Sequence, residues 1–232
     1  MKIALIGHGR LGNLISKYLG RDFELIILDK EKKLEDLEKI KDCKIVILSV
    51  PISNFPDTLQ EIKNYLSPNT IVADTCSVKE WPIQQMEKLL PENVFLLGTH
   101  PMFGPDSVKD TLFGTKLVIC PHRIHENQLE EVINYLHNHG IRTIHTTAED
   151  HDQQMSSSLL LSHFIGKGLL QFGAKEQVID TKGYRRLLRI LETVRNDSDI
   201  LFRDMFKYNR FAKSTLNNFS EALNHVQSII ND

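Results

Sequence analysis

The sequence has few cysteines, almost no net charge and no long apolar run. Cys43, Cys76 and Cys120 are odd in number and widely spaced, so we expect reduced thiols in the cytoplasm rather than a disulfide framework. Lysine and arginine total 28 against 30 aspartates and glutamates, which disfavours a nucleic-acid partner. No apolar run reaches the length of a membrane span, and residues 2–6 are too few for the apolar core of a signal peptide.

Short runs rich in Ile, Leu and Val alternate with amphipathic stretches over residues 1–147. The expected strands are residues 2–6, 24–28, 44–48, 70–73, 94–97 and 116–120, with a last edge strand at 141–146. The amphipathic stretches, such as 11–19, 55–66 and 126–140, are long enough for crossover helices. This alternation predicts an α/β fold whose N-terminal domain is a Rossmann-like, doubly wound parallel sheet.

Strand signals stop after Thr146. Thr147 and Asp150 form a capping box, and helix-forming residues continue to about Lys175. From Ser198 onward, apolar residues at spacings of three and four predict one stripe along a long helix. These residues are Met205, Tyr208, Ala212, Thr215, Phe219, Leu223, Val226 and Ile230. The sequence therefore predicts a smaller all-helical domain at 148–232, with the stripe packed across a homodimer interface.

Three glycines follow the first expected strand in the segment GHGRLG, residues 7–12. Gly7, Gly9 and Gly12 form a Gly-x-Gly-x-x-Gly pattern between a strand and a helix. The missing side chains allow a tight turn and let a pyrophosphate approach the N–H groups at the start of the helix. This context predicts dinucleotide binding, and a glycine-rich turn without a ligand is the alternative.

Asp29 ends the second expected strand, seventeen residues after Gly12. A carboxylate there can accept hydrogen bonds from both ribose hydroxyls of NAD and repel the 2′-phosphate of NADP, so NAD is favoured. Lys30, Lys32 and Lys33 could attract that phosphate or form a solvated run of charges. The other residues expected to bind the cofactor are Arg10, Leu11, Ser49, Val50, Pro51 and Thr75.

The segment GTHPMFGPD, residues 98–106, holds one histidine among two prolines and two glycines. No helical or strand period passes through it, so we expect a fixed, non-regular loop at the carboxyl edge of the sheet. His100 would face the cofactor crevice there as a positioned acid or base. A histidine that caps the loop backbone is the alternative.

The order of the motifs resembles the dehydrogenase domain of prephenate and arogenate dehydrogenases over nearly the whole chain. The motifs are GHGRLG at 7–12, SVK at 77–79, GTHPMFGPD at 98–106, HDQQM at 151–155 and GYRRLLRI at 183–190. The resemblance implies NAD-dependent oxidation and decarboxylation of prephenate to 4-hydroxyphenylpyruvate in tyrosine biosynthesis, with hydride leaving ring C4. Arogenate, which carries an amino group in place of the keto group, is the alternative substrate.

By this resemblance, His100 accepts the proton of the substrate 4-hydroxyl. Ser77 then orients either His100 or that hydroxyl, although it could instead be the N-cap of a helix that starts near Lys79. His100 would interact more strongly with the transition state than with the ground state, because the hydroxyl becomes acidic as hydride leaves.

The two carboxylates of the substrate require cationic donors, and the substrate is expected between the two domains. Arg185 and Arg189 lie four residues apart on one predicted helix face, where they could clamp a carboxylate. Either could be the family's arginine, because Thr-Lys-Gly-Tyr at 181–184 replaces the usual Gly-Gly-Gly-Phe lead-in. His163 matches a second family histidine that approaches the substrate, and a histidine packed on a helix is the alternative.

Three other readings of the sequence have less support. A metal site is not expected, because His151 and His163 would lie about 18 Å apart along a helix. A β-hydroxyacid dehydrogenase would place Asn one helical turn after a lysine, whereas Gln171 follows Lys167. A non-catalytic dinucleotide-binding regulator would have no use for the combined histidine, serine and arginine set.

Overall fold

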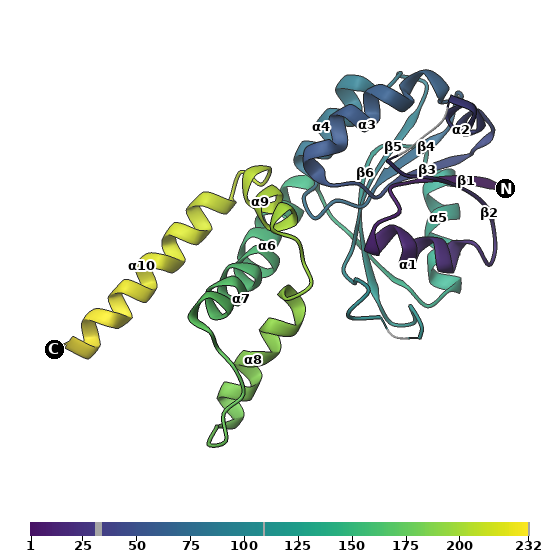
Figure 1. Cartoon of the computed structure of the whole chain (residues 1–232). Helices are drawn as coiled ribbons and strands as arrows, with labels where there is room; N and C mark the ends of the chain where they lie inside the picture. The colour runs from purple at the N-terminus through teal and green to yellow at the C-terminus, as the bar shows by residue number, and fades with distance from the viewer. Residues whose placement is uncertain (31–33, 109, 232) are drawn as a thin grey trace. The chain divides into compact units, whose positions relative to one another are not determined.

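A computed structural model describes residues 1–30, 34–108 and 110–231. The chain divides into two compact units, Met1–His151 and Asp152–Asp232 (Figure 1). The sequence predicts a boundary at 147/148, whereas the division falls between His151 and Asp152, inside helix α6 (Ala148–Met155).

Within the described residues of unit 1, seven strands form one sheet in the order β2-β1-β3-β4-β5-β6-β7. Their bounds are β1 Lys2–Ile6, β2 Glu24–Leu28, β3 Ile45–Leu48, β4 Ile71–Asp74, β5 Phe95–Pro101, β6 Lys116–Arg123 and β7 Arg142–His145. The order reverses at β1 and β3, which is the topological switch point of a doubly wound sheet. The predicted Rossmann-like fold with a helical C-terminal part is confirmed.

The last two strands, β6 and β7, run opposite to the other five and so depart from the predicted parallel arrangement. Neighbouring strands run parallel throughout, except that β6 is antiparallel to β5. A parallel return needs a crossover segment, usually a helix. The described parts of the connection, 102–108 and 110–115, contain no helix that could carry the chain across the sheet.

Helices cover both faces of the sheet, so most strand residues are buried. Helices α1 (Arg10–Leu19) and α5 (Glu126–Asn138) lie on one face, and α3 (Phe55–Ile62) and α4 (Glu80–Leu89) lie on the other (Figure 1). Helix α2 is Leu34–Glu38, and short 3₁₀ turns are Lys39–Asp42, Ile52–Asn54 and Lys63–Tyr65. Every residue of β4 and β5 is buried, which explains why these strands lack a polar alternation.

Unit 2 is helical in its described residues. After the end of α6 come a π-helical turn Ser156–Leu160, then α7 Leu161–Phe172, α8 Lys182–Val194, α9 Asp199–Lys207 and α10 Ala212–Asn231. The expected cap at the start of α6 is present, since Thr147 Oγ1 accepts a hydrogen bond from Asp150 N at 3.1 Å. Helix α7 ends before Lys175 because Gly173 adopts a left-handed φ of 78°. No helix in the described ranges is both long and apolar enough to cross a membrane.

The single long helix predicted after Ser198 is wrong. The chain leaves the helix between α9 and α10, where Asn209 is buried. Its Nδ2 donates to the Asp152 carbonyl at 2.7 Å, and its Oδ1 accepts from Phe211 N at 2.9 Å. This side chain replaces helical backbone bonds at the break. The apolar stripe is therefore divided, with Met205 and Ala212 buried and its last residues on α10 exposed.

Candidate active site

The glycine turn after β1 is tightly packed against the end of β3. Gly7 has a φ of +95°, and a Cβ at this position would lie 2.2 Å from the Ser49 carbonyl oxygen. A Cβ at Gly12 would lie 2.1 Å from the Gly7 carbonyl oxygen. A Cβ at Gly9, by contrast, would meet no heavy atom of the described residues within 4 Å. Gly7 and Gly12 are thus required by the fold, whereas Gly9 leaves open space above the start of α1.

Backbone hydrogen bonds hold the predicted cofactor residues at one edge of the sheet. Gly7 N donates to Leu28 O, directly before Asp29, and Ser49 N donates to Ile6 O, both at 2.7 Å. Thr75 N donates to Leu48 O at 3.1 Å. Val50 and Pro51 follow Ser49 before the 3₁₀ turn. The carboxyl ends of β2, β1, β3 and β4 therefore bring these residues close together, as the sequence predicts for this edge.

The remaining cofactor-site residues lie on the surface. Asp29 and Lys30 are exposed just after β2, whereas Lys32 and Lys33 lie outside the described residues. Arg10 and Leu11 begin α1, and Arg10 Nη2 lies 2.7 Å from Asp106 Oδ1. This exposed ion pair joins the glycine turn to the segment that follows His100.

His100 lies in a strand, so the predicted non-regular loop is wrong at this residue. Strand β5 continues through Gly98, Thr99 and His100 to Pro101, and His100 pairs with Val118 of β6. The antiparallel partner extends the sheet past the last residue of β4, and it fixes the histidine at the carboxyl edge. Leu96, Gly98 and His100 share one face of the strand, the face toward α4, where a Cβ on Gly98 would lie 2.7 Å from Ile83 Cδ1.

The His100 ring is buried against a second histidine. Its exposed fraction is 7%, and its Nδ1 lies 2.9 Å from Nε2 of His151. The His100 pKa is lowered well below its usual value, first because burial disfavours the charged ring and then because His151 and Lys79 repel a further positive charge. The neutral imidazole that a proton acceptor requires is therefore favoured.

A buried ion pair, which the sequence analysis missed, supports the strand below His100. Lys79 and Asp74 are both fully buried, and Lys79 Nζ donates to Asp74 Oδ2 and to the Thr99 carbonyl. Asp74 Oδ1 accepts from Thr99 N at 3.2 Å, and Oδ2 accepts from Cys76 N at 2.9 Å. The sequence held a signal for this pair: Lys79 of the SVK motif follows an apolar strand closely, and a lysine buried there needs a charged partner such as Asp74.

Ser77 makes neither of the protein contacts proposed for it. The N-cap of α4 is Lys79, without a side-chain cap, so Ser77 does not cap this helix. Its Oγ is buried and has no hydrogen-bond partner among the described residues, so it does not orient His100 through a hydrogen bond. His151 occupies that position on the imidazole instead.

In unit 2, His163 and Arg189 line a cavity of about 370 Å³ with Leu159, Ser162, Ile190 and Thr193. His163 is 5% exposed, with Nδ1 at 2.9 Å from the Leu159 carbonyl and Nε2 at 2.8 Å from Asp197 Oδ2. Both ring nitrogens are thus within hydrogen-bond distance of an oxygen atom. Asp197 is a further residue that sequence reasoning missed.

Arg185 does not join Arg189 at this cavity. Both lie on α8, but Arg185 Nε is 3.0 Å from Asp180 Oδ1, and its side chain is largely exposed. The two arginines therefore do not form the clamp on one helix face that the sequence predicted.

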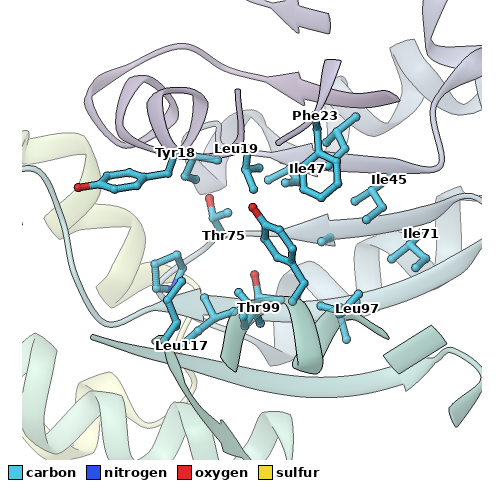
Figure 2. Close-up of a pocket in the computed structure, with 18 of the residues that line it drawn as sticks. Tyr18, Leu19, Phe23, Ile45, Ile47, Ile71, Thr75, Leu97, Thr99 and Leu117 are labelled. Atoms are coloured by element: carbon cyan, nitrogen blue, oxygen red, sulfur yellow. The ribbon is translucent and has the colours of Figure 1, made fainter. Parts of the chain in front are cut away.

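A second cavity of about 450 Å³ lies on the α1 and α5 face of the sheet. Figure 2 shows Phe23, Ile45, Ile47, Ile71 and Leu97 among the side chains around it. Its lining is mostly apolar. Because His100 lies on the other face of β5, this cavity is separate from the candidate catalytic histidine.

Metal ligands and reactive thiols are not apparent in the described parts of the chain. No group of three or more His, Cys, Asp or Glu side chains there is arranged to hold a metal ion. Cys43, Cys76 and Cys120 are free and buried. Burial raises the pKa of Cys43 to about 11, which disfavours the reactive thiolate.

Family models match two parts of the chain, and relatives match nearly all of it. Residues 21–145 match the family described as prephenate dehydrogenase, nucleotide-binding domain, and residues 169–231 match a TYRAAT1-like C-terminal domain. Arogenate dehydrogenase 2, chloroplastic, from Arabidopsis thaliana is 29% identical over 247 residues, covering 98% of this chain and 69% of that protein. Arogenate dehydrogenase 1, chloroplastic, from the same plant is 26% identical over 248 residues, covering 98% of this chain but 39% of its own length.

Solved structures share the fold. The crystal structure of prephenate dehydrogenase from A. aeolicus in complex with hydroxyphenyl propionate and NAD+ superposes with a TM-score of 0.76 at 22% identity. The match covers 99% of this chain and 90% of that one. At this identity the likeness concerns the architecture alone.

Proposed function

Because this chain belongs to the prephenate dehydrogenase family, we propose that it oxidises and decarboxylates prephenate to 4-hydroxyphenylpyruvate, a step of tyrosine biosynthesis. The observation that carries the proposal is the buried, neutral His100 at the carboxyl edge of the sheet. Arogenate is a second candidate substrate, because both Arabidopsis relatives are arogenate dehydrogenases by name.

The glycine turn fits a dinucleotide. The open space at Gly9 would accept the pyrophosphate, and α1 has neither an acidic residue in its first turn nor a side-chain cap on its N-terminus. Its first N–H groups are thus suited to phosphate oxygens. We assign Gly7, Gly9, Arg10, Leu11 and Gly12 to the pyrophosphate and Ser49, Val50, Pro51 and Thr75 to the nicotinamide end. When bound, NAD supplies the hydride acceptor.

Asp29 supports NAD over NADP. Its exposed carboxylate lies directly after β2, where it could accept hydrogen bonds from both ribose hydroxyls and repel a 2′-phosphate. Lys30 is exposed beside it and is the one described residue of the lysine run that could oppose this preference. Replacing Asp29 by Ser should raise kcat/KM with NADP relative to NAD, and an unchanged ratio would contradict this assignment.

We assign to His100 the acceptance of the substrate 4-hydroxyl proton at Nε2. As hydride leaves ring C4, this hydroxyl becomes acidic, so its hydrogen bond to a neutral imidazole strengthens in the transition state. Ser77 has an unpartnered Oγ, which supports a hydrogen bond to the same substrate oxygen.

Loss of CO₂ completes the proposed reaction. The electron pair of the bond between C1 and its carboxylate enters the ring, the ring becomes aromatic, and the oxygen on C4 regains a proton from His100. The imidazole is therefore neutral again at the end of the turnover. The gain of aromaticity makes the step effectively irreversible.

We assign a substrate carboxylate to Arg189 rather than Arg185. Arg189 lines the same cavity as His163, whereas Arg185 is paired with Asp180. A guanidinium can bind a carboxylate through two parallel hydrogen bonds. His163 lines the same cavity and is held in place by its contacts with the Leu159 carbonyl and Asp197.

A second copy of this chain is the proposed partner of α10. Four apolar residues recur at helical spacing on this helix, yet they are exposed, so no apolar neighbour among the described residues covers them. They are Leu223, Val226, Ile229 and Ile230, with exposed fractions of 52%, 54%, 61% and 78%. An exposed apolar stripe of this kind is typical of an interface between subunits. Sedimentation should show a dimer at micromolar concentration, and Val226→Glu should shift it toward the monomer. A wild-type monomer would contradict the assignment.

Turnover assays test the proposed function. NADH formation should appear when the purified protein is mixed with prephenate and NAD, with arogenate and NADP as parallel substrates. His100→Asn should lower kcat by roughly 10²- to 10⁴-fold while leaving NAD affinity nearly unchanged. No turnover with any pair would favour the non-catalytic regulator, and an equal loss of NAD binding in His100→Asn would indicate a structural histidine.

A further inference from the structure

Two buried histidines, distant in sequence, are joined by a hydrogen bond. His100 Nδ1 and His151 Nε2 lie 2.9 Å apart, the two residues are 7% and 2% exposed, and their rings meet edge to face with centroids 5.1 Å apart. The first turn of α6 holds His151 in place, since its backbone N donates to the Thr147 carbonyl at 3.0 Å. Burial of this kind restricts both rings to one geometry.

The proposed reaction determines which nitrogen of each ring carries hydrogen. To accept the substrate proton, His100 needs a lone pair on Nε2, so the single hydrogen of the neutral ring must be on Nδ1. That N–H points at His151, and a short contact between two neutral imidazoles requires one donor and one acceptor. His151 must therefore present the lone pair of its own Nε2.

We propose that His151 is a positioning residue for His100, accepting the Nδ1–H hydrogen bond and so keeping His100 Nε2 free to take the substrate proton. This inference rests on the function proposed above for His100. The opposite arrangement, with His151 as donor, would put the hydrogen of His100 on Nε2. That tautomer cannot accept a proton from the alcohol.

The same hydrogen bond strengthens during the reaction. When His100 becomes an imidazolium, its Nδ1–H bond to His151 is charge-assisted, and such bonds are roughly twice as strong as neutral ones. Because the gain arises only as the proton arrives, it stabilises the transition state relative to the ground state. A carboxylate could accept the same Nδ1–H bond, but it would place a negative charge in this buried site. The neutral His151 ring avoids that cost.

Protonation of the pair before substrate binds should abolish activity, whichever ring holds the extra proton. A charged His151 would carry hydrogen on Nε2 and would force His100 into the inactive tautomer. Lys79, at the start of α4, is a further charged group near His100, and it is paired with Asp74, at the end of β4. Lys79 opposes uptake of a second positive charge.

His151→Gln and His151→Leu test the proposal. Glutamine keeps an oxygen acceptor that does not titrate, whereas leucine removes the acceptor and fills similar space. His151→Leu should lower kcat about 10- to 100-fold, as expected for loss of a hydrogen bond to a charged group, with KM and NAD affinity nearly unchanged. His151→Gln should recover kcat to within about fivefold of the wild type, and the acidic limb of its kcat/KM–pH profile should shift. His125→Leu is the matched control, since this exposed histidine also meets an aromatic ring, that of Phe95, edge to face. It should leave kcat unchanged.

Nitrogen NMR of ¹⁵N-histidine-labelled protein gives a readout independent of turnover. The wild type should show His100 protonated on Nδ1, His151→Gln should keep this form, and His151→Leu should mix the two tautomers. A wild-type proton on Nε2, equal kcat losses in both variants, or no loss in His151→Leu would overturn the proposal. Failure to turn over either substrate would instead reject the proposed function, and the tautomer measurement would still decide whether His151 positions His100.

Discussion

Removing one partner of the buried Lys79–Asp74 ion pair should destabilise unit 1 more than removing both. Lys79→Met keeps most of the apolar stem but deletes the ammonium group, and it leaves a fully buried carboxylate facing two backbone donors, Cys76 N and Thr99 N. A buried charge without its partner is costly because the protein interior solvates it poorly. The Thr99 carbonyl also loses its donor, one residue before His100.

The expected cost is about 3–5 kcal/mol of unfolding free energy, the usual loss when one side of a buried pair is removed. For a domain of 150–250 residues, each kcal/mol shifts Tm by about 2–4 °C, so Tm should fall by about 6–20 °C. The double change Lys79→Met with Asp74→Asn removes both charges and keeps an oxygen that can accept from Thr99 N. Its loss should stay below about 2 kcal/mol, because replacing both members of a buried pair is often nearly neutral.

Urea unfolding followed by far-UV circular dichroism measures these free energies. Lys88→Met is the matched control, since this exposed lysine lies in the last turn of the same helix and should shift stability by less than about 0.5 kcal/mol. Two results would refute the reasoning: a loss below 1 kcal/mol in Lys79→Met, or a double variant as unstable as the single one. Either would mean that the carboxylate is not held by the ammonium group.

Three further predictions concern the site. Burial lowers the folded-state pKa of His100, so the unfolded chain binds more protons than the folded one as pH falls below the unfolded pKa of about 6.5. The contribution of His100 to stability is therefore full above that pH and is lost as pH falls toward the folded pKa. Urea unfolding between pH 7.5 and 5.5 should show this loss in the wild type, and an equal loss in His100→Asn would assign it to another group. Gly9→Ala should weaken NAD binding by at least tenfold in calorimetry with little change in Tm. Gly7→Ala should lower both NAD affinity and Tm, because its Cβ would lie 2.2 Å from a carbonyl oxygen. Retained NAD affinity in Gly9→Ala would place the pyrophosphate elsewhere. Arg189→Gln should mainly raise KM, because a carboxylate contact exists before and during the reaction. Arg185→Gln should leave KM within about twofold of the wild type. The reverse pattern, or a loss of stability alone, would mean that Arg189 does not bind the substrate carboxylate.

Local patterns in the sequence were sufficient to predict the strands and the glycine turn. Apolar runs bounded by turns predicted the strands, because a strand buried on both faces needs a continuous apolar run. Gly7 and Gly12 were recognisable because the positive φ of one and the close backbone approach at both exclude a side chain. Asp29 was predicted to bind the cofactor ribose because it lies at the end of a predicted strand.

Contacts between distant segments were not predictable in this way. Nothing in the local sequence showed that β6 would pair antiparallel with β5 and extend the sheet through His100. The apolar spacing predicted a continuous helix through Asn209, but the chain breaks there. The Asn209 side chain donates to the Asp152 carbonyl, 57 residues earlier in the chain, and no local pattern predicts such a contact.

The sequence by itself determined the order of the elements and the residue types available for chemistry, since both depend on patterns within a few residues. Only the tertiary structure decided their partners: His151 for His100, Asp74 for Lys79, and the separation of Arg189 from Arg185. The physical reason is that a hydrogen bond or an ion pair gains its strength from burial and orientation, and both arise when segments far apart in the chain pack together.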